Sequence, residues 1–538
     1  MESLKAIIQP AIQRFTVLIL LSSLLGCSQS PGDNHPPTSS KSPFAVSSPE
    51  AQGMQSALLA DMMAKALDSS YSIHSMVVIR NGHKVLEANF WPNQAEEPHA
   101  IYSVTKSIVA TLIGIALEKG YLQSLDQPVL DFFPDTQIAN SDPLKDEMTI
   151  RDLLTMSSGL DCRDSSRYYW SGLKTLMESA DWAEHVLSLP MKESPGQYFE
   201  YCNGVSFLLS AIVENSTGMG ALAFADKHLF EPLAIDSVSW KQNHNGRYMG
   251  FSEMMMSPED MAKIGQLYLN KGQWQGRQVL PQAWVEESTI RHLKTDFLDG
   301  YGYQWWIDDS GYYMAIGFRG QAIYVLPDQD MVVVFTGYIF DSRTFYTSLV
   351  EDYLIPSVRS DEPLTENEPA QQKLAALLEQ AKEEGFSWGD KANGFAKDGV
   401  FTRKAAPAFS FQYPKESIKF ELDHPQKIMR MSSPTHSDFD AAVFDLEQEV
   451  SYADAVQWYA KGLQGVGSDI RVESQEVLIL DCGTEAYQAQ YTWLYGGEVP
   501  LSTLVVFAKQ ENKAVVISVH DQQYEWIARS LKFDKTAY

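Results

Sequence analysis

A hydroxyl and an amine lie three residues apart in this chain, at Ser103 and Lys106, at the start of an apolar run over residues 107–116. The run predicts a helix that is buried on nearly all sides and ends at Gly120, a typical residue for that position. Residues three apart share one face of a helix, so we expect the Lys106 amine within hydrogen-bond reach of the Ser103 hydroxyl. The first-turn N–H groups also favour the negative charge that develops on an attacked carbonyl. These residues predict a serine nucleophile with a lysine beside it.

The same spacing occurs elsewhere, at Ser171 and Lys174, and residues 38–41 form a threonine version. The first of these follows an aromatic loop without a long apolar helix behind it, and the second lies in a Pro/Ser-rich stretch that cannot hold a rigid site. Context therefore favours Ser103. The alternative is that Ser103 only caps its helix and that the lysine after it is solvated.

Downstream partners argue against that alternative. Tyr201 and Asn203 lie on a predicted tight turn over residues 195–204, just before another helical run, where their side chains can project into a cleft. Tyr268 and Asn270 have the same spacing, but they close an amphipathic run, which predicts a core-facing tyrosine. Tyr201 is therefore the candidate third member of the site.

Ser-x-x-Lys, then Tyr-x-Asn, then a glycine-containing strand resembles the serine β-lactamase and penicillin-recognising superfamily. The stretches 148–160, 257–265 and 300–306 resemble its class C-type branch, which includes esterases, amide hydrolases and D-aminopeptidases as well as lactamases. The resemblance covers roughly residues 51–360. It implies an α/β (α+β) fold of two lobes: an antiparallel sheet of five or more strands flanked by helices, and a helical lobe, with the cleft between them.

The glycine-containing strand, the third motif, departs from the family pattern. Where family members have a Lys-Thr-Gly strand, this chain has residues 314–321, which contain no lysine. Gly317 keeps the backbone accessible, and the N–H of Phe318 or of a close neighbour would be the second oxyanion donor beside that of Ser103. Arg319 is the cation placed to replace the missing lysine, unless it is a strand-edge arginine paired with a surface acid. This version looks most like relatives that hydrolyse 6-aminohexanoate oligomers, which favours short esters or linear amides over penicillins.

The implied chemistry is acyl transfer in two steps. Ser103 attacks a carbonyl while either a neutral Lys106 or a Tyr201 phenolate takes its proton. Tyr201 then protonates the leaving group, and Asn203 orients the substrate or holds the lysine. The few histidines show no metal-ligand spacing, so we expect no metal and no cofactor. A DD-peptidase or β-lactamase acting on cell-wall peptides or β-lactams stays open, and so does a catalytically silent binding lipoprotein.

The first 27 residues resemble a bacterial lipoprotein signal, with a short apolar stretch ending in Leu-Leu-Gly before Cys27. This implies cleavage before Cys27 and acylation of its thiol, which anchors the enzyme to a membrane in the periplasm of the bacterial cell envelope. Ser28 favours the outer membrane. Residues 28–50 form a Pro/Ser-rich tether. The alternative is an ordinary secretory signal.

An oxidising envelope makes the remaining cysteines informative. Cys162 follows the phrase Ser-Ser-Gly-Leu-Asp, and Cys202 lies between Tyr201 and Asn203, so both should flank the same cleft. We predict a disulfide between Cys162 and Cys202 that holds the tyrosine turn, with Cys482 left as a free thiol.

The formal net charge of −27 argues against a nucleic-acid partner, whose binding needs clustered Lys and Arg. Residues 361–400 predict a linker with a helix over 371–384. From about residue 401 to 538 the pattern changes to period-two alternation, which predicts strands over 409–414, 441–450, 485–495, 501–508 and 513–520. Helices are expected over 452–462 and 522–531. This region resembles small antiparallel α/β domains of the PsbP and Mog1 type. No catalytic constellation appears there. We expect this domain to bind a protein or envelope partner, or to shape the hydrolase cleft.

Overall fold

The computed structural model describes residues 42–384, except 70, 92, 165–170 and 340–341, and beyond them mainly the strands between 394 and 533. The described residues from 44 onward belong to one unit of the chain. The lipoprotein signal with Cys27, most of the tether and Cys482 lie outside the described residues.

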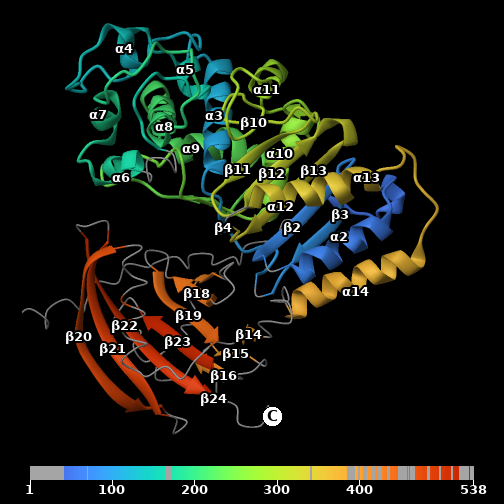
Figure 1. The fold of residues 1–538 in the computed structure, drawn as a ribbon. Helices are drawn as coiled ribbons and strands as arrows, with labels where there is room; N and C mark the ends of the chain where they lie inside the picture. The colour runs from blue at the N-terminus through green and yellow to red at the C-terminus, as the bar shows by residue number, and fades with distance from the viewer. Residues whose placement is uncertain are drawn as a thin grey trace, which may run out of the picture. The chain divides into compact units, whose positions relative to one another are not determined.

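The core of residues 44–337 is an eight-stranded sheet in the order β1-β3-β2-β13-β12-β11-β10-β9 (Figure 1). Neighbouring strands are antiparallel, except for the parallel pair β1 and β3. Strands β2 and β13 are buried along their whole length, so both faces of the sheet must be covered. The strands are β1 (Ala45–Val46), β2 (Ile73–Arg80), β3 (His83–Asn89), β9 (Gly300–Tyr301), β10 (Trp306–Ile307), β11 (Tyr313–Gly317), β12 (Gln321–Leu326) and β13 (Met331–Gly337).

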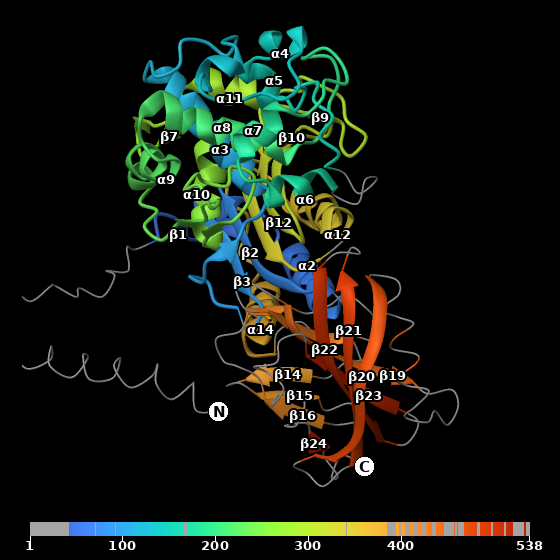
Figure 2. The ribbon, with the colours of Figure 1, turned by 90° about the vertical axis from the view of Figure 1, so that its left-hand side faces the viewer.

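Helices cover both faces. Helix α10 packs on β2, β12 and β13, and in Figure 2 it lies on the opposite side of the sheet from α2 and α12. Tyr268, on α10, is 1% exposed and contacts the Thr111 hydroxyl, as expected for a core residue. These helices are α2 (Ser56–Asp68), α10 (Pro258–Leu269) and α12 (Ser342–Leu349).

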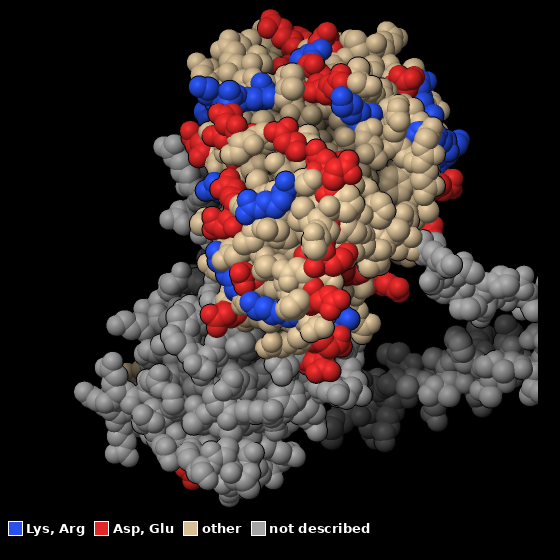
Figure 3. Space-filling view, turned by 90° about the vertical axis from the view of Figure 1, so that its right-hand side faces the viewer, with Lys and Arg blue, Asp and Glu red and all other residues tan. Residues whose placement is uncertain are grey.

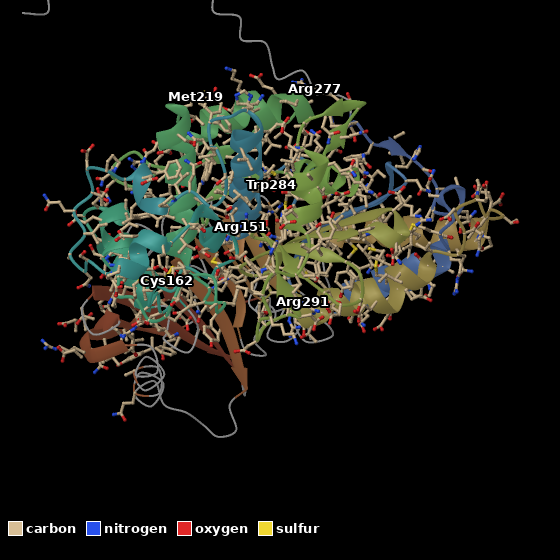
Figure 4. The ribbon with its side chains drawn as sticks, turned by 90° about the horizontal axis from the view of Figure 1, so that it is seen from above. Arg151, Cys162, Met219, Arg277, Trp284 and Arg291 are labelled. Carbon is tan, nitrogen blue, oxygen red and sulfur yellow. A yellow bond between two sulfur atoms is a disulfide. The ribbon has the colours of Figure 1, made fainter. Side chains whose placement is uncertain are left out.

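The helical lobe is built around α3 (Val104–Glu118), whose first thirteen residues are all buried. The helix ends as predicted, with Gly120 in the left-handed conformation at φ +75°. At Gly114 a β-carbon would come within 2.5 Å of the Trp284 ring, so glycine is needed for this packing (Figure 4). The other helices here are α4 (Pro143–Glu147), α5 (Ile150–Leu154), α6 (Ser171–Glu178), α7 (Trp182–Leu187), α8 (Asn203–Thr217), α9 (Ala221–Ala225) and α11 (Gln282–Ser288).

A buried glutamine between strands β9 and β10 joins the sheet to the helical lobe. The Gln304 side chain donates to the carbonyl of Leu154 at 2.9 Å and accepts from the Ser206 hydroxyl at 2.8 Å, while its own carbonyl accepts from the Ser107 hydroxyl at 2.6 Å. It thereby connects α5, α8 and α3. Because buried polar groups must find partners, these bonds restrict how the three helices can be arranged.

The helix expected in the linker is α14 (Glu368–Glu384), and it packs against α2 and β3. The Trp91 N–H donates to the Ala381 carbonyl at 2.8 Å. Within the described part of the chain, no single helix is long and apolar enough to cross a membrane. Only the pair 203–217 and 221–233 passes that test, when joined across a 74° bend.

The C-terminal region forms two antiparallel sheets, in the orders β14-β15-β16-β24 and β17-β18-β19-β23-β22-β21-β20. The alternation expected over 409–414, 441–450, 485–495, 501–508 and 513–520 corresponds to β16, β19, β21, β22 and β23. The helices predicted over 452–462 and 522–531 lie outside the described residues, apart from two positions in the first. The strands are β14 (Gly394–Lys397), β15 (Val400–Arg403), β16 (Phe409–Gln412), β17 (Ile418–Phe420), β18 (Lys427–Ser432), β19 (Ser437–Asp445), β20 (Gly467–Ile479), β21 (Glu485–Tyr495), β22 (Val499–Gln510), β23 (Lys513–Val519) and β24 (Lys532–Phe533).

Figure 3 shows one face of the described residues, on which acidic and basic side chains are interspersed and no single basic area forms.

Candidate active site

The three predicted groups meet at the first turn of α3. Ser103 is the N-cap residue of this helix. Lys106 Nζ lies 3.1 Å from Ser103 Oγ, and the Tyr201 hydroxyl donates to the same oxygen at 3.0 Å. An amine and a phenol therefore both contact one hydroxyl, the arrangement that activates a serine nucleophile.

The residue before the nucleophile has an unusual backbone. Tyr102 adopts φ +44°, in the left-handed region that bulky residues rarely occupy. Such a conformation costs about 1–3 kcal/mol and persists only where the surrounding structure holds it. The Ile101 N–H donates to the Met254 carbonyl at 2.9 Å, and the Tyr102 ring contacts Phe318 edge-on at 5.8 Å. These contacts fix the turn that presents Ser103.

Lys106 is held in a buried polar cage. It is 1% exposed, and its Nζ lies 2.8 Å from Asn203 Oδ1 and 3.0 Å from the Phe251 carbonyl. Burial lowers the pKa of Lys106 to about 7, even though the negative charge of Asp164 acts in the opposite direction. A lysine of this kind can hold or release a proton near neutral pH, as a general base requires.

Tyr201 lies on the turn before α8, with its ring stacked on Trp306 at 6.2 Å. Burial raises the pKa of Tyr201 above its ordinary value of 10.0, although the hydrogen bond with Ser103 lowers it. The phenol therefore keeps its proton at neutral pH, and its hydroxyl is a donor toward Ser103. Of the two candidate bases, this environment favours Lys106.

The third motif forms the end of β11 and the turn after it. At Gly317 a β-carbon would come within 2.3 Å of the Ile101 carbonyl oxygen, so this strand end lies directly against the chain leading to Ser103. Phe318 is 50% exposed. Arg319 has φ +63°, and its guanidinium lies 3.6 Å from the centroid of the Tyr338 ring. The position of Gly317 supports an oxyanion site formed with the first turn of α3.

The predicted disulfide between Cys162 and Cys202 is confirmed, with a Cα–Cα distance of 5.6 Å. It lies in the helical lobe, where Figure 4 labels Cys162. The bond joins the loop after Leu160 to the residue between Tyr201 and Asn203. It therefore ties that loop to the turn that carries the phenol.

Three contributors were not singled out from the sequence. The Phe251 carbonyl contacts Lys106, but a backbone group carries no signal in the sequence. Trp306 lies in the 300–306 stretch that supported the resemblance, and its ring is the platform for Tyr201. Asp164, 3% exposed, accepts a hydrogen bond from the Asn203 N–H at 2.7 Å. An acid two residues after Cys162 was the available clue for Asp164.

Within the residues the structure describes, no three or more His, Cys, Asp or Glu side chains are grouped to hold a metal ion. The arrangement around Ser103 supports acid–base and nucleophilic chemistry by side chains of this chain.

The part of the chain that contains this site is similar to known proteins. A family model described as Beta-lactamase matches residues 56–339. The chain is 26% identical to the 6-aminohexanoate-dimer hydrolase of Paenarthrobacter ureafaciens over 287 residues, which are 48% of this chain and 71% of that protein. It is 28% identical to Esterase EstB of Burkholderia gladioli over 153 residues, 27% of this chain and 38% of the esterase. A solved D-stereospecific amidohydrolase from Streptomyces has a TM-score of 0.44 and 16% identity, covering 55% of this chain and 99% of that one.

Proposed function

Because this chain belongs to the β-lactamase family, we propose that it is a serine hydrolase that cleaves short esters or linear amides through an acyl-enzyme on Ser103. The observation that carries the proposal is the contact of both Lys106 Nζ and the Tyr201 hydroxyl with Ser103 Oγ. The β-lactamase relationship is shared by hydrolases of several substrate classes, so the substrate class rests on further features.

Acylation follows from the protonation states described above. Lys106, in its neutral form, takes the proton of Ser103 as Oγ bonds to the substrate carbonyl carbon. The N–H groups of Ser103 and Phe318 stabilise the oxyanion. Tyr201 donates its phenolic proton to the leaving oxygen or nitrogen and recovers a proton from Lys106. Water then attacks the acyl-enzyme, its proton passes to the same pair, and Ser103 leaves with a proton.

The substrate class is inferred from two sources. The third motif contains no lysine, whose cation holds the substrate carboxylate in β-lactamases of the familiar type. Two relatives are named as a 6-aminohexanoate-dimer hydrolase and an esterase. Both features favour linear amides and esters over β-lactam rings. Arg319 is the cation within this motif and would replace the missing lysine. Asn203, whose Oδ1 accepts from Lys106 Nζ, would orient the lysine.

A parallel screen tests the proposal. Wild type and Ser103→Ala are compared on p-nitrophenyl esters, aminoacyl amides and nitrocefin, and labelling by a fluorophosphonate probe is followed in both. Ser171→Ala is the matched control, because Ser171 precedes a lysine by the same spacing but lies on α6. We expect ester or amide hydrolysis and labelling in wild type and in Ser171→Ala, and neither in Ser103→Ala. Turnover of nitrocefin alone would instead support the lactamase alternative.

We also propose that the enzyme is anchored in the cell envelope through a lipid on Cys27, on the strength of the signal-like residues 1–27. Metabolic labelling with a radioactive fatty acid should mark the wild-type protein but not Cys27→Ala. The region after residue 400 is proposed to dock a protein or envelope partner. Removing it should then reduce envelope retention without reducing turnover, whereas reduced turnover would indicate that it shapes the cleft.

A further inference from the structure

A buried carboxylate lies beside the site but outside the mechanism given above. Asp164 is 3% exposed, and it follows Cys162 by two residues in the loop that the disulfide ties to the tyrosine turn. An isolated buried carboxylate is costly unless other groups compensate its charge. Its partners therefore indicate what it does.

The first partner is the start of α8. The Asn203 N–H, the first in this helix, donates to Asp164 Oδ2 at 2.7 Å. The N-cap residue Cys202 makes no side-chain capping bond, because its sulfur is in the disulfide. Asp164 therefore supplies the acceptor that a capping side chain normally provides, at the positive end of the helix dipole.

The second partner is the start of α6. At Gly172 a β-carbon would come within 2.5 Å of Asp164 Oδ1, so this helix begins directly against the carboxylate. Burial raises the pKa of Asp164 to about 6, while hydrogen bonds from Asn203 and the Leu173 backbone oppose that rise. The carboxylate is therefore mostly ionised at neutral pH.

The third partner is Lys106, which Asn203 connects to the carboxylate: the Asn203 N–H donates to Asp164 at 2.7 Å, and Asn203 Oδ1 accepts from Lys106 Nζ at 2.8 Å. Among the residues that the structure describes, the ionisable groups that act on Lys106 are Ser103 on its own helix, Tyr201 from the turn before α8, and Asp164 from the loop after Leu160. Asn203 and the Phe251 carbonyl, which also contact the amine, are neutral. Asp164 is thus the negative charge that favours the ammonium form of Lys106.

Resting on the proposed function, we propose that Asp164 is a positioning residue for this active site. It holds the start of α8, and with it Tyr201 and Asn203, and it supplies the counter-charge that sets the pH at which Lys106 becomes a base. A carboxylate that only stabilised the fold would do the first of these things but not the second.

The test is the pH dependence of kcat/KM for Asp164→Asn with a p-nitrophenyl ester. Its acid limb reports the essential base of the free enzyme. Without the negative charge the ammonium form of Lys106 is less stable, so the limb should move to lower pH by about one unit. Because Asn203 and Tyr201 are less well held, kcat should fall by about 10- to 100-fold. The pH dependence of fluorophosphonate labelling should shift in the same direction.

Asp161→Asn is the matched control. Asp161 lies on the same loop, but its carboxylate pairs with Arg163 at 2.8 Å, so this variant should keep the wild-type acid limb and kcat. Asp164→Glu keeps the charge while changing the geometry, and should lower kcat without moving the limb. If Asp164→Asn does not fold, Asp164→Ser supplies a smaller neutral acceptor for the same measurement.

An acid limb that stays at the wild-type position in a folded, neutral Asp164 variant would overturn the inference, and so would an equal shift in Asp161→Asn. Hydrolysis retained by Ser103→Ala would instead overturn the proposed function. The two failures are therefore distinguishable in one set of variants.

Discussion

Replacing Lys106 with methionine should stabilise the protein near neutral pH while removing its activity. Burial lowers the Lys106 pKa from 10.5 to about 7. In the unfolded chain this lysine still binds a proton between pH 7 and pH 10.5, whereas in the folded protein it is neutral. Protonation therefore favours the unfolded state, and the free energy of unfolding falls as the pH is lowered from 10.5 towards 7. Each pH unit in that window corresponds to about 1.4 kcal/mol. Between pH 10 and pH 7, wild type should lose roughly 3–4 kcal/mol that Lys106→Met does not lose.

Urea unfolding followed by tryptophan fluorescence at pH 7 and pH 10 measures this quantity. The difference between wild type and Lys106→Met isolates the lysine, since most other titrating groups are common to both proteins. Methionine is a suitable replacement because it is unbranched and apolar. Hydrolysis by the variant should fall by about 10²- to 10⁴-fold, the usual contribution of a general base.

Lys84→Met is the control for this experiment. Lys84 is also buried, but it pairs with Glu87 and Glu259 at 2.7 Å each. Burial acts to lower its pKa, yet the two glutamates raise it overall. Its stabilising contribution is therefore present throughout pH 7–10, and the difference from wild type should stay nearly constant. If the Lys106→Met difference changes by less than about 1 kcal/mol over the same range, Lys106 is not desolvated and the reasoning about the base is wrong.

Three further perturbations have defined outcomes. Replacing Cys162 and Cys202 with alanine should cost about 4 kcal/mol of unfolding free energy by the loop-entropy relation, because the bridge joins residues 40 positions apart; an unchanged denaturation midpoint would contradict this. Gly317→Ala should lower kcat by about 10²- to 10³-fold, since its β-carbon would come within 2.3 Å of a backbone carbonyl oxygen, and wild-type kcat would argue against the oxyanion site. Burial lowers the pKa of His74 to about 3, with a further contribution from His99, whose own pKa burial lowers to about 4. The stability that these neutral histidines contribute is present above pH 6.5 and is lost below it, by up to about 1.4 kcal/mol per pH unit for each histidine. The melting temperature of wild type should therefore fall more steeply with decreasing pH than that of His74→Phe.

Much of the active site could be predicted because its central contact is local. Ser103 and Lys106 are three residues apart, and the apolar run after them indicates a helix, so helix geometry alone brings the amine to the hydroxyl. The resemblance to a known family placed Tyr201 in the same site. The disulfide followed from the positions of Cys162 and Cys202 beside the predicted cleft.

Other features could not be predicted, for physical reasons. Strand β20 was not expected, because residues 471–477 are exposed along both faces and show no alternation of burial. The helix expected over 371–384 formed, but its packing against α2 depends on residues from the opposite end of the domain. The backbone carbonyl of Phe251 is a group that every residue possesses. Such contacts arise only when distant segments meet.

The sequence by itself determined that Ser103 and Lys106 lie close together, because residues three apart share one face wherever a helix forms. The protonation state of that site was decided by packing. Asn203 and Phe251 lie 97 and 145 positions from Lys106, and only the folded arrangement encloses the amine and removes it from water. The pKa of Lys106 depends on all the atoms that exclude water from its amine, and the spacing of residues along the chain does not show which atoms these are.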